Sequence, residues 1–156
     1  KKGYNMRVLN AVESVNEYQK NILFEKFVRY YDGNVSGKKV ALWGLAFKPE
    51  TDDMREAPSL VLINSLLSVE CTICAYDPIA MEECKKRIGD KISYANSLYE
   101  TVVDADVIFH VTEWKEFRMP SWSVIKKLMK PNPVLFDGRN VYTASDLDGI
   151  MYIKIG

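Results

Sequence analysis

Three basic side chains occupy positions at which a ligand carrying negative charge could bind. Lys48 follows an apolar run at 39–43, Arg55 lies at the start of the helix expected at 53–68, and Arg139 follows another apolar run at 134–136. The start of a helix attracts anions, so cations placed beside it favour a shared anionic ligand such as a diphosphate. Alternatively, the three cations only neutralise neighbouring carboxylates, because solvated charge pairs are common at loop ends. Those neighbours are Glu50, Asp52, Asp53, Glu56 and Asp137.

The acidic residues Asp52, Asp53 and Glu56 allow two interpretations of their own. Their oxygens could hold a magnesium ion. Capping the helix that follows, and complementing its dipole, explains them more simply. We therefore expect these residues to stabilise a helix start.

Cys71, Cys74, Cys84 and His110 could notionally supply four zinc ligands. The first two flank an expected strand, where residues three apart face opposite sides, and the other two belong to different elements. Free cysteine usually behaves as a small buried hydrophobe, so no metal site is expected. His110 lies within a strongly apolar run, which favours a core histidine over a general base.

Apolar runs alternate with amphipathic helical patterns after residue 38. This alternation predicts an α/β fold with a doubly wound, mostly parallel Rossmann-like sheet, which binds ligands beyond the carboxyl ends of its strands. Asp77 would there touch a ribose hydroxyl or cap the next helix. Only Gly44 is present where a Gly-x-Gly-x-x-Gly fingerprint would be needed, so the sheet should not hold the pyrophosphate of NAD in the usual way. The expected strands are 39–43, 72–76, 91–94, 107–111, 134–136 and 150–155, and the expected helices are 53–68, 79–87, 97–105 and 122–129.

A long helix is expected to precede the sheet. Residues 5–31 contain no proline or glycine and carry apolar side chains at helical spacing on several sides of the cylinder. We interpret residues 1–33 as a connecting helix that forms a homodimer, and residues 34–156 as the ligand-binding Rossmann-like domain. The alternative is a helix that packs wholly within its own domain.

The overall composition limits the classes of partner. The 21 basic and 21 acidic residues balance, so no global field favours nucleic acid or an anionic membrane. No apolar run reaches the roughly 18 residues that a membrane span needs. Three cysteines cannot all pair within one chain, which favours a reducing, cytoplasmic location.

The residues in the loops carry a resemblance to a known family. The run from Gly44 to Ser59 resembles the C-terminal domain of the UDP-glucose/GDP-mannose dehydrogenase family. Further similar segments follow at 76–78, 112–118 and 136–140, and residues 15–20 are similar to the long central helix of that family. The form Lys48-Pro49-x-Thr51 resembles the UDP-glucose members more than those acting on GDP-mannose or UDP-N-acetylmannosamine.

The resemblance implies an NAD-dependent, two-step oxidation of a sugar 6-hydroxyl to a carboxylate. Phe47, Lys48 and Arg139 resemble residues that contact the UDP-sugar, here expected to be UDP-glucose, and Arg55 resembles an arginine that reaches NAD. For Phe47 the alternative is a place in the core. The family's nucleophilic cysteine and dinucleotide fingerprint are not found in this sequence, so the chain is expected to contain no catalytic residue and to be inactive alone. A different class remains open, a non-catalytic oligomerisation module.

Overall fold

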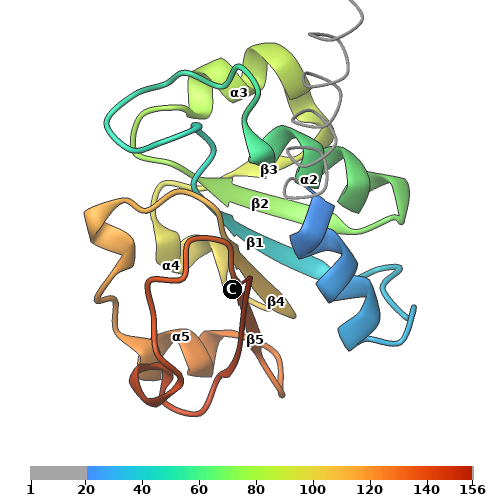
Figure 1. Cartoon of the computed structure of the whole chain (residues 1–156), viewed down its shortest axis with the longest axis vertical. Helices are drawn as coiled ribbons and strands as arrows, with labels where there is room; N and C mark the ends of the chain where they lie inside the picture. Colours follow the sequence, from blue (N-terminus) through green and yellow to red (C-terminus); the bar gives the residue numbers. More distant parts are fainter. Residues whose placement is uncertain (1–20, 156) are drawn as a thin grey trace, which may run out of the picture.

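The computed structural model describes residues 21–155, which form a six-stranded, fully parallel sheet (Figure 1). The strand order is β3-β2-β1-β4-β5-β6, so the winding reverses between β1 and β4. This arrangement confirms the doubly wound Rossmann-like sheet. The strands are β1 (Lys39–Trp43), β2 (Thr72–Tyr76), β3 (Ser93–Tyr94), β4 (Val107–His110), β5 (Val134–Asp137) and β6 (Met151–Lys154).

The carboxyl ends of five strands lie level with one another. Trp43 at the end of β1 pairs with Tyr76 of β2 and with His110 of β4. His110 pairs in turn with Asp137 of β5, and Asp137 pairs with Lys154 of β6. Because the sheet is parallel, the loops that follow these strands leave from the same edge, which is called the carboxyl edge below.

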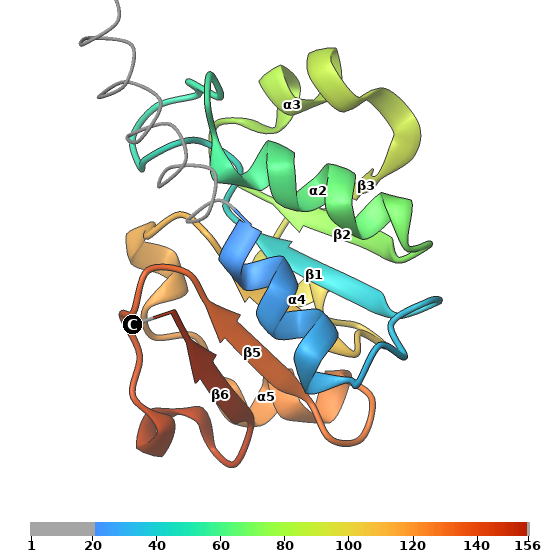
Figure 2. The same ribbon diagram turned by 45° about the vertical axis from the view of Figure 1, so that its right-hand side comes forward.

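Helices cover both faces of the sheet, because alternate residues of a strand point to opposite sides. Val40 and Leu42 face the core that also contains residues of the helix at 21–30 and of α2 and α3. Ala41 and Trp43 face a second core with α4 and α5. Figure 2 shows the helix at 21–30 and α2 on one side of the sheet and α5 on the other. The helices are α2 (Pro58–Ser68), α3 (Met81–Ile88), α4 (Leu98–Thr101) and α5 (Trp122–Leu128), with short 3-10 turns at η1 (Gly89–Lys91), η2 (Lys115–Phe117) and η3 (Ala144–Leu147).

The expected N-terminal helix is described only in part. Residues 21–30 are helical, and the preceding residues of that prediction lie outside the described range. Phe27 is fully buried, with its ring 5.4 Å from that of Phe109 and 6.0 Å from that of Phe136. The Lys26 ammonium donates a hydrogen bond of 2.8 Å to the carbonyl of Lys154. This part of the helix therefore packs on the sheet of the same chain.

Helices α2 and α4 differ most from the sequence predictions. Helix α2 begins at Pro58 rather than at residue 53, because proline disfavours helical backbone in the residue before it and fits well in the first helical turn. Helix α4 ends at Thr101, whereas the sequence predicted 97–105. Within residues 21–155, no helix combines the length and apolarity that crossing a membrane requires.

Candidate functional site

Side chains from three other elements fix the start of the loop after β1. The buried carboxylate of Asp77 accepts hydrogen bonds from the backbone N–H groups of Leu45 (2.8 Å) and Ala46 (3.2 Å). The Ser59 hydroxyl donates to the carbonyl of Leu45 (2.6 Å), and the Thr112 hydroxyl donates to that of Ala46 (2.7 Å). Hydrogen bonds thus fix both the N–H groups and the carbonyl groups of the backbone that leads to Phe47 and Lys48.

Gly44 allows this loop to approach the loop after β4. Its φ of +96° lies in the left-handed region, and a Cβ placed there would stand 2.4 Å from the Cβ of Thr112. A side chain at this position would therefore be both strained and in collision. A single glycine at the end of β1 is therefore sufficient for this turn, without the further glycines of a dinucleotide fingerprint.

Asp77 has a different role from either one expected. Its second oxygen accepts from the N–H groups of Ile79 (2.9 Å) and Ala80 (2.8 Å), and the Trp114 indole N–H donates to the first oxygen (3.2 Å). The residue at the start of α3 is Ala80, so Asp77 forms the turn that precedes the helix and does not cap it. Asp77 is fully buried and cannot reach a ribose.

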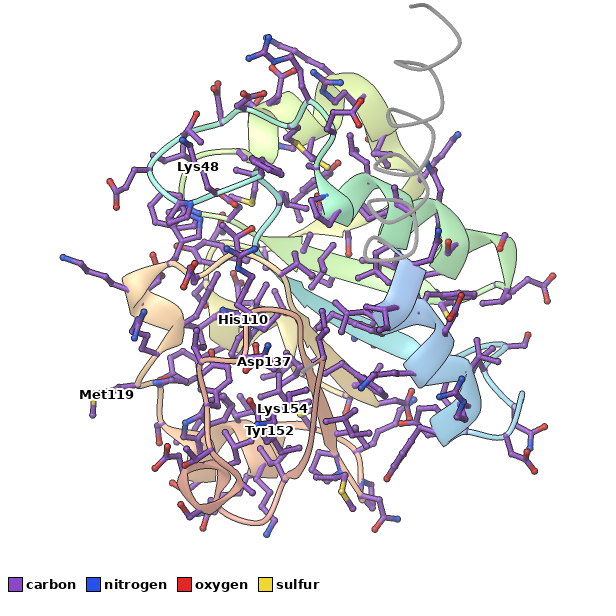
Figure 3. The ribbon with its side chains drawn as sticks, viewed as in Figure 1. Lys48, His110, Met119, Asp137, Tyr152 and Lys154 are labelled. Atoms are coloured by element: carbon purple, nitrogen blue, oxygen red, sulfur yellow. The ribbon has the colours of Figure 1, made fainter. Side chains whose placement is uncertain are left out.

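A second buried carboxylate, that of Asp137, organises the loop after β5. Each of its two oxygens accepts three hydrogen bonds. Figure 3 shows Asp137 beside His110 in the interior of the fold. The donors to Oδ1 are His110 Nδ1 (3.0 Å), Arg139 N (2.9 Å) and Asn140 N (3.0 Å), and those to Oδ2 are Val141 N (2.8 Å), Tyr142 N (3.3 Å) and the Tyr152 hydroxyl (2.7 Å).

These hydrogen bonds keep Asp137 ionised. Burial by itself disfavours the charged form, but the hydrogen bonds from His110, Tyr152 and the backbone of Arg139 outweigh it and lower the pKa of Asp137. The carboxylate can only accept, so Nδ1 of His110 carries a proton. His110 is fully buried, which confirms the core histidine, and its Nε2 has no hydrogen-bond partner among residues 21–155.

The residues expected to contact the ligand are exposed on the carboxyl edge. Phe47 is 49% exposed, so its placement in the core is wrong. Lys48 is exposed on the loop after β1 (Figure 3), and no described residue forms an ion pair or hydrogen bond with its ammonium group. The ends of β1 and β5 are separated only by β4, which places them roughly 10 Å apart. Lys48 and Arg139 therefore belong to neighbouring loops.

The two arginines form ion pairs. Arg55 contacts Asp53 through both nitrogens of its fork, at 3.1 Å and 3.0 Å, and is exposed. Arg139 donates to Glu113 at 2.9 Å, although Glu113 was not among its expected acidic neighbours. The interpretation in which nearby carboxylates neutralise the cations thus holds for the side chain of Arg55. It does not hold for Arg139, whose partner comes from the loop after β4.

The acidic residues at 52–56 and the three cysteines were considered above as helix caps or metal ligands. Helix α2 has no acidic residue in its first turn and no side-chain cap, so the capping role of the 52–56 acidic residues is wrong. Asp53 instead accepts hydrogen bonds from Arg55, which lowers its pKa to about 2. Cys71, Cys74 and Cys84 are free thiols. Among the described residues, no three His, Cys, Asp or Glu side chains are arranged to hold a metal ion.

Sheet and edge together define a Rossmann-like α/β domain in which two loops, each organised by a buried aspartate, present exposed aromatic and basic side chains. Residues 41–144 match the UDP binding domain of the UDP-glucose/GDP-mannose dehydrogenase family. The chain belongs to this family.

Relatives and a solved structure with similar sequences are UDP-glucose dehydrogenases. A UDP-glucose 6-dehydrogenase from Pseudomonas aeruginosa is 43% identical over 161 residues, covering 99% of this chain and 35% of the relative. One from Bacillus subtilis is 36% identical over 98% of this chain and 35% of its own length. The solved structure of a UDP-glucose dehydrogenase from Pyrobaculum islandicum superposes with a TM-score of 0.78 at 27% identity, covering 97% of this chain and 32% of that one. The chain thus spans about a third of the length of these relatives.

Proposed function

We propose that the chain is the UDP-sugar-binding part of an NAD-dependent UDP-glucose 6-dehydrogenase. Residues 34–156 would form the binding domain, and residues 1–33 the helix that connects it to the rest of the protein. The observation that carries this proposal is the pair of neighbouring loops fixed by Asp77 and Asp137, which expose Lys48 and Arg139 on one edge. The names of the relatives support UDP-glucose as the sugar nucleotide.

In this function the domain positions the substrate and makes no bonds. The Lys48 ammonium and the Arg139 guanidinium would bind the diphosphate, and the exposed ring of Phe47 would form one wall of the pocket. Binding energy from the remote diphosphate can orient the sugar C6 toward a nucleophile and a nicotinamide held by the rest of the protein. Because those groups lie outside this chain, we expect the 156 residues alone to be inactive.

NAD would supply the hydride acceptor. The residues present fit only a peripheral contact with NAD. The end of β1 has Gly44 but not the other glycines of a dinucleotide fingerprint, and the only side chain that we assign to the cofactor is the fully exposed guanidinium of Arg55. NAD would therefore be held mainly by the remaining part of the protein. Arg55→Ala should weaken the binding of NAD more than the binding of UDP-glucose. Equal losses of affinity for the two ligands would contradict this division.

The test of the proposed function is UDP binding by the full-length protein, measured by calorimetry. Lys48→Ala and Arg139→Ala should each weaken it by about 1.5–3 kcal/mol, the range of hydrogen bonds to charged groups. Lys91→Ala is the matched control, because Lys91 is also exposed but precedes β3 and so lies at the opposite end of the sheet. Unchanged affinity in both edge variants would refute the assignment.

A panel of nucleotide sugars tests the substrate. The full-length protein should oxidise UDP-glucose in preference to GDP-mannose and UDP-N-acetylhexosamines. If one of these is preferred, the family assignment stands and the proposed sugar is wrong. If the protein oxidises none of them and binds no UDP, the chain is instead an oligomerisation module.

The homodimer is a separate part of the proposal. On the helix at 21–30, Phe24, Glu25, Val28 and Arg29 line an open hollow of about 350 Å³, and Phe24 and Val28 are only half-buried. This apolar surface favours a helical partner from a second copy. Val28→Asp should convert the full-length protein to a monomer in sedimentation experiments, and an unchanged assembly would contradict the dimer through this helix.

A further inference from the structure

Glu113 places a negative charge on the edge at which we propose that an anion binds. Its Oε1 lies 2.9 Å from Nη2 of Arg139, and its Oε2 lies 3.9 Å from Nη2 of Arg118. Glu113 and Arg139 are each about one third exposed, and Arg118 is 56% exposed. One carboxylate therefore stands between two guanidinium groups, with a different oxygen toward each.

A phosphate oxygen and the Glu113 carboxylate require the same donors. Both are anionic acceptors suited to the guanidinium fork of Arg139, and like charges brought to one fork repel each other. The contact with Arg139 has the length of a charged hydrogen bond, whereas the contact with Arg118 is longer than a hydrogen bond. Without a ligand, Glu113 thus occupies Arg139 and leaves Arg118 as a second partner within reach.

We propose that Glu113 is a built-in competitor for the diphosphate, which occupies Arg139 in the free protein and transfers to Arg118 when the ligand binds. The proposal rests on the function given above, since it needs Arg139 to be a ligand contact. Glu113 would then set the affinity of the site: the ligand must displace a carboxylate before it gains Arg139. Arg118 keeps the displaced carboxylate neutralised.

The neighbouring Glu116 provides a control for this idea. It belongs to the same loop after β4 and carries the same charge, but its carboxylate accepts a hydrogen bond of 3.0 Å from the Tyr76 hydroxyl and pairs with no described arginine. Glu113→Gln and Glu116→Gln change the net charge equally. Only the first removes the charge that competes for Arg139.

The experiment measures UDP affinity of the full-length variants by calorimetry at low salt. Glu113→Gln should increase the affinity for UDP about two- to fivefold, the factor that corresponds to an exposed ion pair. Glu116→Gln should change this affinity much less. Arg118→Ala should weaken UDP in the protein that keeps Glu113 and have little effect in the Glu113→Gln background. High salt should shrink the gain of Glu113→Gln.

Any of three results would overturn the inference: weaker or unchanged UDP binding in Glu113→Gln, equal gains in both glutamine variants, or an Arg118→Ala effect that is the same in both backgrounds. Weaker binding would assign Glu113 to positioning Arg139. Arg139→Ala, measured in the same series, separates this failure from a failure of the proposed function. If Arg139→Ala weakens UDP while Glu113→Gln does not tighten it, only the competitor is refuted.

Discussion

Substituting Asp137 by asparagine keeps the shape of the side chain but removes its charge and one of its two acceptor oxygens. The carboxylate is fully buried and receives three hydrogen bonds at each oxygen. Two donors at each oxygen are backbone N–H groups, which cannot reverse their direction. Whichever way the amide turns, its NH₂ group faces two backbone donors that then lose their acceptor.

The size of the effect follows from these two donors. A fully buried donor without a partner costs about 1–3 kcal/mol. Three of the four backbone donors are only partly buried, so Asp137→Asn should reduce the free energy of unfolding by about 2–4 kcal/mol. Asp104→Asn is the control, because Asp104 is exposed and asparagine tolerates its positive φ of 57°. Urea unfolding followed by circular dichroism at neutral pH gives both values. A loss below about 1 kcal/mol in Asp137→Asn would refute the role assigned to the carboxylate.

The same variant has a signature in pH. The folded state lowers the pKa of Asp137 below its usual value, so the carboxylate contributes stability at neutral pH that is lost as the pH falls below about 4. The difference in unfolding free energy between the original protein and Asp137→Asn should therefore narrow on acidification, by up to about 1.4 kcal/mol per pH unit. A constant difference from neutral pH down to the acid limit of folding would show that folding does not lower the pKa of Asp137.

Three further changes test single contacts. Tyr152→Phe removes one of the six hydrogen bonds to the carboxylate of Asp137 and should cost about 1.5–3 kcal/mol in urea unfolding. A loss larger than that of Asp137→Asn would contradict the shared role of the six donors. Gly44→Ala should destabilise by at least about 2 kcal/mol, because it adds a collision at 2.4 Å to backbone strain, whereas Gly33→Ala, with open space around its Cβ, should lose only the strain of about 1–2 kcal/mol. Equal losses for the two alanines would refute the close approach. Arg55→Ala should raise the pKa of Asp53 from about 2 toward the usual 3.9 in an NMR titration, and no change would show that the ion pair does not persist in solution.

The order and type of the strands could be predicted from local sequence, although the bounds of some strands differ: β3 covers only Ser93–Tyr94 of the predicted 91–94. Apart from Lys39, the runs 39–43 and 72–76 consist of apolar or β-branched residues, and both strands have the predicted bounds. Helix starts were predicted less well, since charged residues at 52–56 suggested a cap while Pro58 set the actual start. In that loop the acidic residues serve Arg55 and turns of the backbone, a role that composition does not distinguish from capping.

The site was predictable only in part, for a reason of topology. The sequence shows which basic residues follow buried strands, and Lys48 and Arg139 lie in the loops after β1 and β5, as predicted. The partner of Arg139 could not be read, because Glu113 lies 26 residues earlier and meets it only through the pairing of β4 with β5. The role of Asp137 left a weak signal: an aspartate at a strand end followed by Gly138 is a common start for a turn in which the carboxylate accepts backbone N–H groups.

The two buried aspartates explain why charged and polar residues recur at the strand ends without contacting a ligand themselves. Asp77 and Asp137 stand at the ends of β2 and β5, and each carboxylate accepts hydrogen bonds from backbone N–H groups of a loop on the carboxyl edge. Both carboxylates are thus satisfied by hydrogen bonds inside the protein, whereas Lys48 and Arg139 stay exposed on the carboxyl edge. Gly138 links the second loop to the N-terminal helix, because a Cβ there would stand 2.9 Å from the Leu23 side chain. The helix at 21–30 therefore packs closely against the start of the loop that carries Arg139.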